Sequence, residues 1–433
     1  MNTVNKHEAI LTKLVGIVAT VAFIAAIALS PSVIGFLLAP DGIIDNPSMV
    51  IEINILRILG GFFAGTLFLF RSRVVIYLTN HPQVFASAIG ILGIVGIVSI
   101  VELSLFYANR GSKESIILES LEKAHLPTLL DKDLGYRPLA SSKIRVVKKS
   151  GDRILYDAHY SHDKNSRRVV PAAGESQDDK DIAVFFGDSF TYGEGVDDDE
   201  TMPYFYSVAS GKYQSFNYGF SGYGPQNMLA MLENDTYLAP VVDKISAKGT
   251  NSCPIVVYTF IDHHIMRALG SLSVMTYGQD LPYYQLKDNE VERTGSFSSD
   301  RPITSKALRF LSHSKILKAL HVEFPIKIDD RSLNTTVKII SKSRDLASHK
   351  LRNSNFFVIL YPGTTLAGLI RPKLEALNLN VLDYSGADTG FNMDEMTIAI
   401  DRHPNGIGHR HIADLLARDI GNVPCKDSLS VNN

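Results

Sequence analysis

Short apolar runs separated by helical patterns constrain the fold of the second half of this chain. Runs of this length, alternating with helices, are typical of parallel strands that are buried on both faces. The sequence therefore predicts an α/β fold in which functional residues follow the carboxyl ends of the strands. The five candidate strands are residues 182–186, 213–217, 255–260, 356–361 and 381–384.

A serine stands at the tip of the first candidate strand, within the tetrapeptide Gly187-Asp188-Ser189-Phe190. Its hydroxyl is a weak nucleophile unless a base lies within hydrogen-bond reach and a third group orients that base. Far downstream, Asp401 and His403 are two residues apart, which places both side chains on one side of an extended segment. A single loop histidine is often only a cap or a surface residue, but together with Ser189 this pair predicts a Ser-His-Asp relay for acyl transfer.

Two segments resemble the SGNH (GDSL-type) hydrolase superfamily. Residues 181–195, DIAVFFGDSFTYGEG, are similar to its first block, and residues 401–412, DRHPNGIGHRHI, are similar to its last. The resemblance implies a flavodoxin-like parallel sheet with helices on both faces. It also implies that Ser189 is the nucleophile, His403 the base and Asp401 the partner of that base.

The segment 217–224, NYGFSGYG, resembles the second block of the superfamily, in which a glycine N–H binds the oxyanion. The resemblance assigns this role to Gly222, together with the amide of Ser189; each fixed donor contributes about 3 kcal/mol to the stability of the tetrahedral intermediate. The alternative is that these glycines only permit a tight turn.

The third block of the superfamily, Gly-x-Asn-Asp, is absent. The corresponding strand end carries Asp262, His263 and His264. An aspartate stabilises an oxyanion only when it is protonated, whereas a neutral histidine can donate from a ring nitrogen. His263 or His264 is therefore the expected third donor, and His263 enters the predicted site. This departure marks a divergent member of the superfamily.

The first 110 residues contain three long apolar stretches, at 14–30, 53–70 and 86–106, interrupted only by Arg57 and Glu102. Each approaches the roughly 20 residues that cross a bilayer as a helix. A cleaved signal peptide does not explain three such stretches. We therefore predict a membrane domain of three transmembrane helices over residues 1–110.

The charges that flank these stretches predict the orientation of the chain. Lys6 and Lys13 precede the first stretch, and Arg71 and Arg73 lie between the second and third. Positive residues stay preferentially in the cytoplasm, so the remainder of the chain is expected on the periplasmic or extracellular side. The positive residues that follow the third stretch oppose this assignment.

The remainder of the chain divides into three predicted parts. Residues 111–180 are expected to form a juxtamembrane helix, with its polar turn at 119–123, and a small β extension; 181–424 form the catalytic domain, and 425–433 a tail. An insertion around 270–350 contains an amphipathic pattern over 303–320. It suits a substrate lid or a membrane-resting surface, or simply an extra helix that closes the core.

Charge and cysteine content limit the possible partners. The 43 basic and 45 acidic residues nearly balance, so no nucleic-acid partner is expected. Cys253 and Cys425 both fall at the amino-terminal end of the predicted sheet, where a disulfide between them is plausible in an oxidising compartment. The spacing of Cys and His predicts neither a metal site nor a cofactor.

The sequence predicts a membrane-anchored serine esterase that acts on acyl or acetyl esters of envelope glycans or lipids through an acyl-enzyme. One alternative is an O-acyltransferase that uses the same residues on an exported glycan, as the resemblance allows. Another is a catalytically silent binding module on a membrane scaffold, because the third block is altered.

Overall fold

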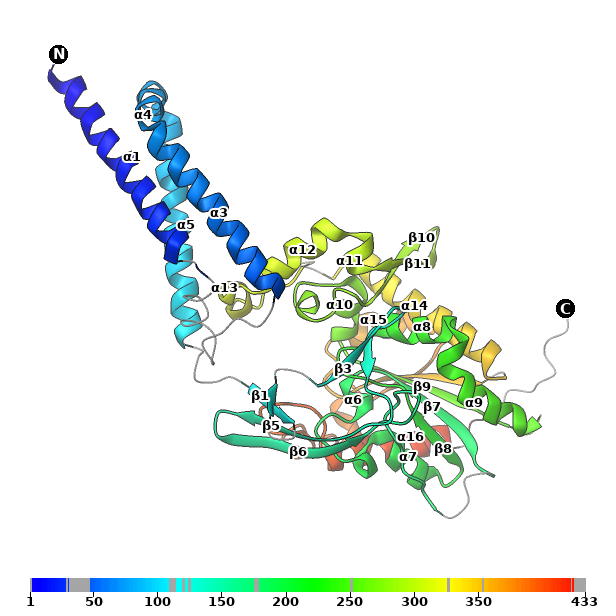
Figure 1. Cartoon of the computed structure of the whole chain (residues 1–433). Helices are drawn as coiled ribbons and strands as arrows, with labels where there is room; N and C mark the ends of the chain where they lie inside the picture. The colour runs from blue at the N-terminus through cyan, green and yellow to red at the C-terminus, as the bar shows by residue number, and fades with distance from the viewer. Residues whose placement is uncertain are drawn as a thin grey trace. The chain divides into compact units, whose positions relative to one another are not determined.

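A computed structural model divides the chain into two compact units, Met1–Leu103 and Ser104–Asn433. We call them the helical unit and the α/β unit; they are seen in blue to cyan and in cyan to red, respectively, in Figure 1. The structure describes residues 2–28, 30, 47–108, 114–118, 121–123, 126–174, 179–249, 252–324, 328–352, 354–421 and 423.

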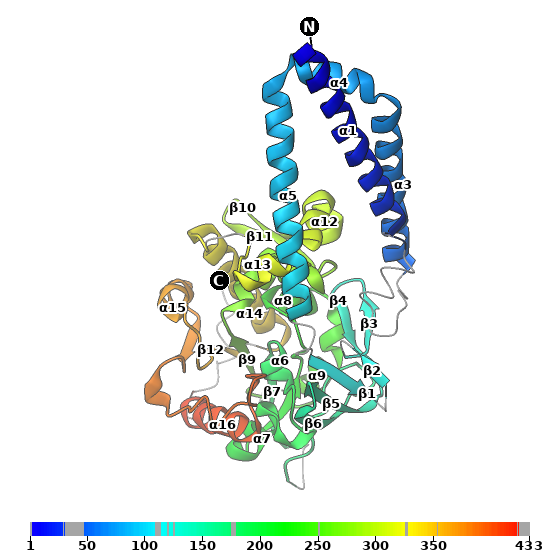
Figure 2. The same ribbon diagram turned by 90° about the vertical axis from the view of Figure 1, so that its left-hand side faces the viewer.

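The described part of the helical unit consists of helices. Helix α1 lies along α3, where Arg57 Nε donates to the Ala26 carbonyl oxygen at 3.1 Å. Arg71 and Arg73, expected in a loop between two spans, instead begin α4, because the chain leaves helical geometry only at Phe70 (φ −99°, ψ 14°). The helices are α1 (Asn2–Ala28), α3 (Pro47–Leu69), α4 (Arg71–Asn80) and α5 (Pro82–Ala108), which runs on past Leu103 (Figure 2).

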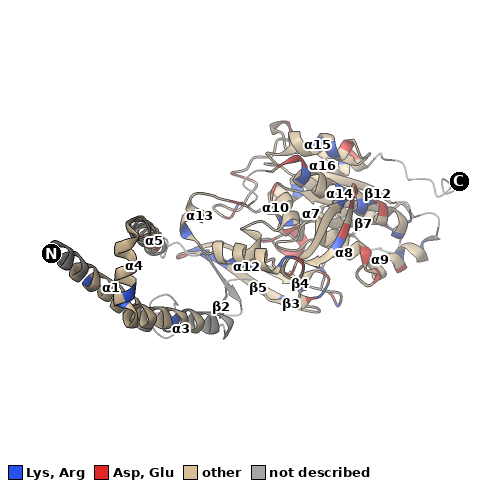
Figure 3. Cartoon of the chain, turned by 90° about the horizontal axis from the view of Figure 1, so that it is seen from above, with Lys and Arg blue, Asp and Glu red and all other residues tan. Residues whose placement is uncertain are grey.

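The three predicted spans lie largely within α1, α3 and α5, and Figure 3 shows few charged residues along α3 and α5. Over the described ranges, no single helix reaches the length and apolarity of a membrane span. The segments Arg57–Leu69 and Arg71–Asn80 have the length and apolarity of a membrane span only when they are taken together, and the chain bends by 75° at their junction. The three spans and the orientation drawn from them therefore stay predictions.

A five-stranded parallel sheet forms the centre of the α/β unit. Its order is β13-β12-β9-β7-β8, which in chain order from the β8 edge is the flavodoxin-like 2-1-3-4-5. The register places Val184 beside Val256 and Tyr258 beside Val358. Each predicted strand is present within one residue of its predicted bounds: β7 (Asp181–Phe186), β8 (Tyr213–Asn217), β9 (Ile255–Phe260), β12 (Asn355–Leu360) and β13 (Asn380–Asp383).

Helices cover both faces of this sheet (Figure 1). Successive strand residues point to opposite faces, so Val184 and Tyr258 pack into one apolar cluster and Phe185 and Val257 into another. The first cluster is completed by α8 (Pro225–Glu233), α9 (Asp235–Ala247), α14 (Asp330–Lys350) and α15 (Ala367–Glu375), and the second by α7 (Met202–Ser210) and α16 (Gly406–Ile420). The α/β part of the predicted fold class is thus confirmed.

A β extension precedes the central sheet. The helix expected around 119–123 is wrong at 121–123, where the chain forms β2; residues 119 and 120 lie outside the described part of the chain. Strand β2 pairs with β1, and β1 pairs with β5, both antiparallel. Pairing with β5 overrides the local helical pattern in a segment that contains the β-branched Ile116 and Ile117. The extension comprises the sheet of β1 (Glu114–Leu118), β2 (Leu121–Lys123), β5 (Lys143–Ser150) and β6 (Arg153–Ser161), and the hairpin of β3 (Thr128–Asp131) and β4 (Gly135–Pro138).

A buried arginine ties this extension to the core. Arg168 is 2% exposed, and its Nε donates to Asp198 Oδ1 at 2.6 Å, next to the short helix η1 (Asp198–Glu200). Its Nη2 donates to the Val196 carbonyl oxygen at 2.8 Å, and its guanidinium carbon lies 4.2 Å from the centre of the Tyr160 ring. A buried guanidinium with these partners fixes the extension against the sheet.

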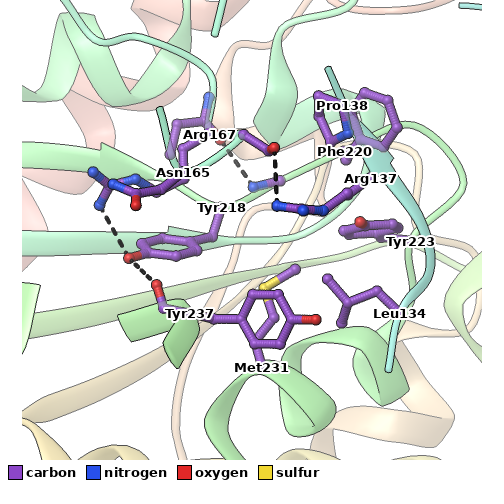
Figure 4. A pocket seen from close by; sticks show the side chains of 13 residues that line it. Leu134, Arg137, Pro138, Asn165, Arg167, Tyr218, Phe220, Tyr223, Met231 and Tyr237 are labelled. Carbon is purple, nitrogen blue, oxygen red and sulfur yellow. Dashed lines mark hydrogen bonds between the residues drawn. The ribbon is translucent and has the colours of Figure 1, made fainter. Parts of the chain in front are cut away.

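Figure 4 shows a second contact between the extension and the core. Tyr218 Oη accepts from Arg167 Nη1 at 3.0 Å and donates to the Tyr237 carbonyl oxygen at 3.0 Å. Arg137 Nη1 donates to Ser166 Oγ at 3.2 Å. The cavity among these residues measures about 30 Å³, room for little more than one water molecule. It is a packing gap rather than a substrate site.

The predicted insertion is shorter than expected. Helix α14 belongs to the core, because Leu333 and Val337 pack into the first cluster. The single amphipathic helix expected over 303–320 is two helices, since Ser314 accepts from the Leu317 N–H at 3.1 Å and caps a new helix. The elements here are α10 (His263–Leu269), η3 (Val274–Thr276), β10 (Pro282–Lys287), β11 (Glu290–Ser296), α11 (Phe297–Asp300), α12 (Pro302–Leu311) and α13 (Lys315–Ala319).

Helix α12 has one packed side and one open side. Leu308 packs against the cluster that contains Val274 and Phe297, as expected for a helix that closes the core. Ile303 and Phe310 on the same helix are 84% and 79% exposed. A lid or membrane role for this helix stays a prediction.

The proposed disulfide falls partly outside the described residues. Cys253 is buried immediately before β9 and is not a free thiol. Cys425 and the tail 425–433 lie outside the described part of the chain.

Candidate active site

The predicted nucleophile stands directly beyond the carboxyl end of β7. Gly187 makes the turn, and a Cβ at that position would lie 2.2 Å from Thr191 Oγ1, so only glycine fits. Asp188 accepts from the Phe190 N–H at 3.0 Å and caps α6 (Ser189–Tyr192). The strand, turn and cap together fix Ser189 at the first position of this helix.

The predicted base and acid arrive on the loop that precedes α16. His403 Nε2 lies 2.8 Å from Ser189 Oγ, and its Nδ1 is hydrogen-bonded to Asp401 Oδ1. The loop has a strained backbone, because Ile400 and Arg402, on either side of Asp401, adopt φ of +72° and +68°. The structure thus brings Ser189 together with the predicted base and acid, which follow it in the sequence by 214 and 212 positions.

Charges around the loop shift the pKa of both titratable members. Burial alone would raise the pKa of the Asp401 carboxyl, but the bonds from His403 and Lys148 outweigh burial and hold the pKa well below its usual range. Burial lowers the pKa of His403, but the carboxylates of Glu194 and Asp401 outweigh it, and the net pKa lies above its usual value. Asp401 is therefore ionised at neutral pH, and the neighbouring carboxylates stabilise the imidazolium that forms when His403 takes a proton.

The two predicted backbone donors line the same cavity as the serine hydroxyl. Among the described residues, the N–H groups of Ser189 and Gly222 donate to no protein oxygen. Gly222 has φ of +80°, and a Cβ there would lie 2.3 Å from Tyr136 Oη. The two interpretations of Gly222, a tight turn and an oxyanion-binding amide, are therefore compatible, because the left-handed turn leaves its N–H at the cavity wall.

The three candidates for the third donor have different surroundings. Asp262 accepts from Thr365 Oγ1 at 2.6 Å and so fastens the loop after β12. His264 is fully buried, with Nδ1 2.8 Å from Tyr258 Oη and Nε2 3.3 Å from Asp188 Oδ2. His263 lines the cavity, and burial lowers its pKa, so the ring is neutral at neutral pH.

Three polar residues at the site were missed by sequence reasoning. Arg267 Nη1 lies 2.6 Å from Asp188 Oδ2, directly behind the nucleophile. Glu194 lines the cavity and accepts from Ser221 Oγ. Lys148 Nζ lies 2.5 Å from Asp401 Oδ2. Lys148 shares a strand face with Val146, but the burial of that face is known only from the structure, so nothing in the sequence pointed to this residue.

The cavity in front of Ser189 has a volume of about 620 Å³, within the range of small-molecule sites. Its wall is partly aromatic, and it carries two arginines and two carboxylates. Over the described residues, no group of three or more His, Cys, Asp and Glu side chains is arranged to hold a metal ion. Besides Ser189, Asp401 and His403, its lining comprises Leu126, Thr128, Tyr136, Phe190, Glu194, Phe220, Ser221, Gly222, Ile261, His263, Arg267, Thr276, Tyr277 and Arg402.

No protein-family model matches the chain, and no curated protein is significantly similar to it in sequence. Among solved structures, the chain is similar to a member of the lipolytic protein G-D-S-L family from Veillonella parvula, with 15% identity and a TM-score of 0.31, over 56% of this chain and 99% of that one.

Two carbohydrate esterases are also similar. One is an acetyl xylan esterase from the rumen bacterium Butyrivibrio proteoclasticus, with 12% identity and a TM-score of 0.34 over 71% of this chain and 82% of that one. The other is a carbohydrate esterase family 2 enzyme from Corynascus thermopiles, with 13% identity and a TM-score of 0.31 over 72% and 86%. At these identities and scores, the likeness by itself assigns no activity to this chain.

Proposed function

We propose that the α/β unit is a serine esterase that cleaves acyl or acetyl esters through an acyl-enzyme. The observation that carries this proposal is the distance of 2.8 Å between Ser189 Oγ and His403 Nε2, in a ring whose other nitrogen is bonded to an ionised Asp401. This is the arrangement that makes a hydroxyl nucleophilic at neutral pH.

The mechanism follows from these contacts. Ser189 Oγ attacks the ester carbonyl carbon while His403 Nε2 takes the hydroxyl proton, and Asp401 stabilises the imidazolium that results. The oxyanion is received by the N–H groups of Ser189 and Gly222, with His263 as the third donor. His403 then returns the proton to the leaving alcohol. Water attacks the acyl-enzyme by the same route and regenerates Ser189.

For the substrate, we propose an acyl or acetyl ester of an envelope glycan or lipid. The cavity of about 620 Å³ holds an ester and one or two sugar rings, and its aromatic and charged walls suit a polar ligand. The apolar helices of the other unit support a membrane anchor, with the α/β unit on the periplasmic or extracellular side. Transfer of the acyl group to a glycan alcohol differs from hydrolysis only in the acceptor.

The test uses the full chain purified in detergent. We expect turnover of p-nitrophenyl acetate and covalent labelling by a fluorophosphonate, with the adduct on Ser189 and not on Ser221, which lines the same cavity. Ser189→Ala should abolish both signals, and Ser299→Ala, at an exposed serine outside the cavity, should change neither. A folded wild-type protein that neither turns over the ester nor takes the label would point to a binding module instead.

A further inference from the structure

Asp401 has a second cationic partner besides the imidazole. Its side chain is 1% exposed, and each carboxylate oxygen has its own donor. Oδ1 accepts from the ring and from the backbone N–H of His403, the latter at 3.2 Å. Oδ2 accepts from Lys148 Nζ at 2.5 Å. No rotation of the carboxylate preserves both sets of bonds, so the two partners together define its orientation.

The position of Lys148 within the extension explains how its side chain comes to this place. Val146 pairs with Ala158 and Lys148 with Tyr156, which puts Val146 and Lys148 on one face of β5. That face is turned inward, because Val146, Ala158 and Tyr156 are all buried. A lysine on such a face is unfavourable unless its charge is paired. Lys148 is only 13% exposed, and Asp401 supplies the pairing charge.

The backbone around Lys148 is also held in place. The register of β5 and β6 shifts between Lys148 and Lys149, and such bulges redirect a side chain. The neighbouring Tyr156 packs against the Glu194–Gly195 turn: its ring lies 3.1 Å from where a Gly195 Cβ would be, and its Oη donates to Glu194 Oε1 at 3.4 Å. Lys148 thus reaches Asp401 from a fixed strand rather than from a mobile loop.

We propose that Lys148 is a positioning residue of the active site, whose ammonium group holds the outer oxygen of Asp401 so that the inner oxygen stays directed at His403. This inference rests on the proposed esterase function. Lys148 is not among the residues that line the cavity in front of Ser189, and in this proposal it acts through Asp401. The β extension thereby contributes a charged residue to a site whose nucleophile, base and acid all belong to the core of the α/β unit.

A positive charge behind Asp401 also affects the titration of His403. The ammonium opposes formation of the imidazolium. Without Lys148, the bond from the His403 backbone N–H still keeps the Asp401 carboxylate near the ring, although less well oriented, so removal of the positive charge should raise the pKa of His403. We expect a rise of about one unit in Lys148→Met. Lys148→Arg keeps the charge and should stay near wild type. Lys143→Met is the matched control, because Lys143 is an exposed lysine on the same strand.

The first experiment follows the His403 ring by NMR in the full chain labelled with carbon-13 at histidine, with assignment from His403→Gln. The expected result is the rise in pKa for Lys148→Met and none for Lys143→Met. An unchanged pKa in folded Lys148→Met would overturn the proposal. If Lys148→Met does not fold, Lys148→Gln, which keeps a donor but no charge, should show the same rise.

The second experiment measures ester hydrolysis against pH. Lys148→Met should lower kcat roughly 10- to 100-fold, the effect of a slightly misplaced catalytic group, with little change in KM, and should move the acid limb of kcat/KM to higher pH. In an Asp401→Asn background, the same change should have no further effect. An equal loss in both backgrounds, with the acid limb unmoved, would mean that Lys148 serves only the fold. If the wild type turns over no ester, the proposed function fails, while the NMR titration still decides the role of Lys148.

Discussion

The ion pair behind the nucleophile gives a sharp prediction about stability. Asp188 Oδ2 is 2.6 Å from Arg267 Nη1, and the two side chains are 0% and 12% exposed. Removal of the cation by Arg267→Met leaves a buried carboxylate beside His264 alone, and burial lowers the pKa of that ring and so disfavours its charged form. Loss of one partner of such a pair typically destabilises a protein by about 3–5 kcal/mol. For a unit of this size, that loss lowers Tm by roughly 5–15 °C.

The loss should depend on pH. In the wild type, burial alone would raise the pKa of Asp188, but Arg267 and His264 outweigh burial and hold the pKa well below its usual range. The carboxylate therefore contributes stability above the pKa of the unfolded chain, and this contribution is lost only as the pH falls through the low folded pKa. In Arg267→Met the sign reverses: burial now raises the pKa of Asp188, and protonation relieves the unpaired charge. The deficit should therefore shrink between pH 8 and pH 5.

The assay is thermal unfolding of the full chain at both pH values. The chain has 18 tyrosines and no tryptophan, so the near-ultraviolet circular dichroism of tyrosine is the suitable signal. Asp188→Asn combined with Arg267→Met removes both charges and should recover part of the lost Tm. The reasoning is refuted if Arg267→Met melts within about 1 °C of wild type, or if its deficit is the same at pH 5 and pH 8.

Three further predictions concern the proposed activity. Asp401→Asn should lower kcat by about 10⁴-fold with little change in KM, because the imidazole loses its orienting carboxylate; steady-state kinetics would show it, and a loss below tenfold would contradict the assignment. The raised pKa of His403 means that activity disappears as the pH falls through a value above about 6.5, so an acid limb of kcat/KM centred below pH 6 would be inconsistent with it. Gly222→Ala should lower both Tm and kcat, because the added Cβ would lie 2.3 Å from Tyr136 Oη. Gly211 also has a left-handed backbone but has open space around it, so Gly211→Ala should lose only about 1 kcal/mol of stability. Equal Tm values for the two variants would refute the steric argument.

The parts of the fold that were predictable are those in which local pattern and tertiary packing agree. The run 182–186 is apolar at every position because β7 is an interior strand, between β9 and β8, with helices on both faces of the sheet; such a short apolar run is typical of a buried strand. Predictions failed where a distant partner decides the structure. Residues 119–123 have a helical pattern, but the described part of this segment, 121–123, pairs as a strand with β1, whose own partner is β5. The break at Ser314 depends on a single cap.

The candidate site divides in a similar way. Ser189, Asp401 and His403 are recognisable because each stands in a short segment with its own spacing, and strand order then brings the segments to one edge. Arg267 and Lys148 have no such local signature. Each is an ordinary basic residue until the fold places a buried carboxylate beside it. Arg267 is 79 positions from its partner Asp188, and Lys148 is 253 positions from its partner Asp401, so neither pairing can be predicted from the local sequence around one residue.

The left-handed residues that flank Asp401 have a further consequence. Ile400 and Arg402 occupy a conformation that non-glycine residues, and β-branched ones above all, adopt only under constraint. Replacement of Ile400 by glycine would remove the backbone strain and would also make the loop that carries Asp401 more flexible. Selection for thermal stability alone would then tend to favour substitutions that hold the Asp401 carboxylate less firmly. Higher stability would therefore come at the expense of catalytic rate at this position.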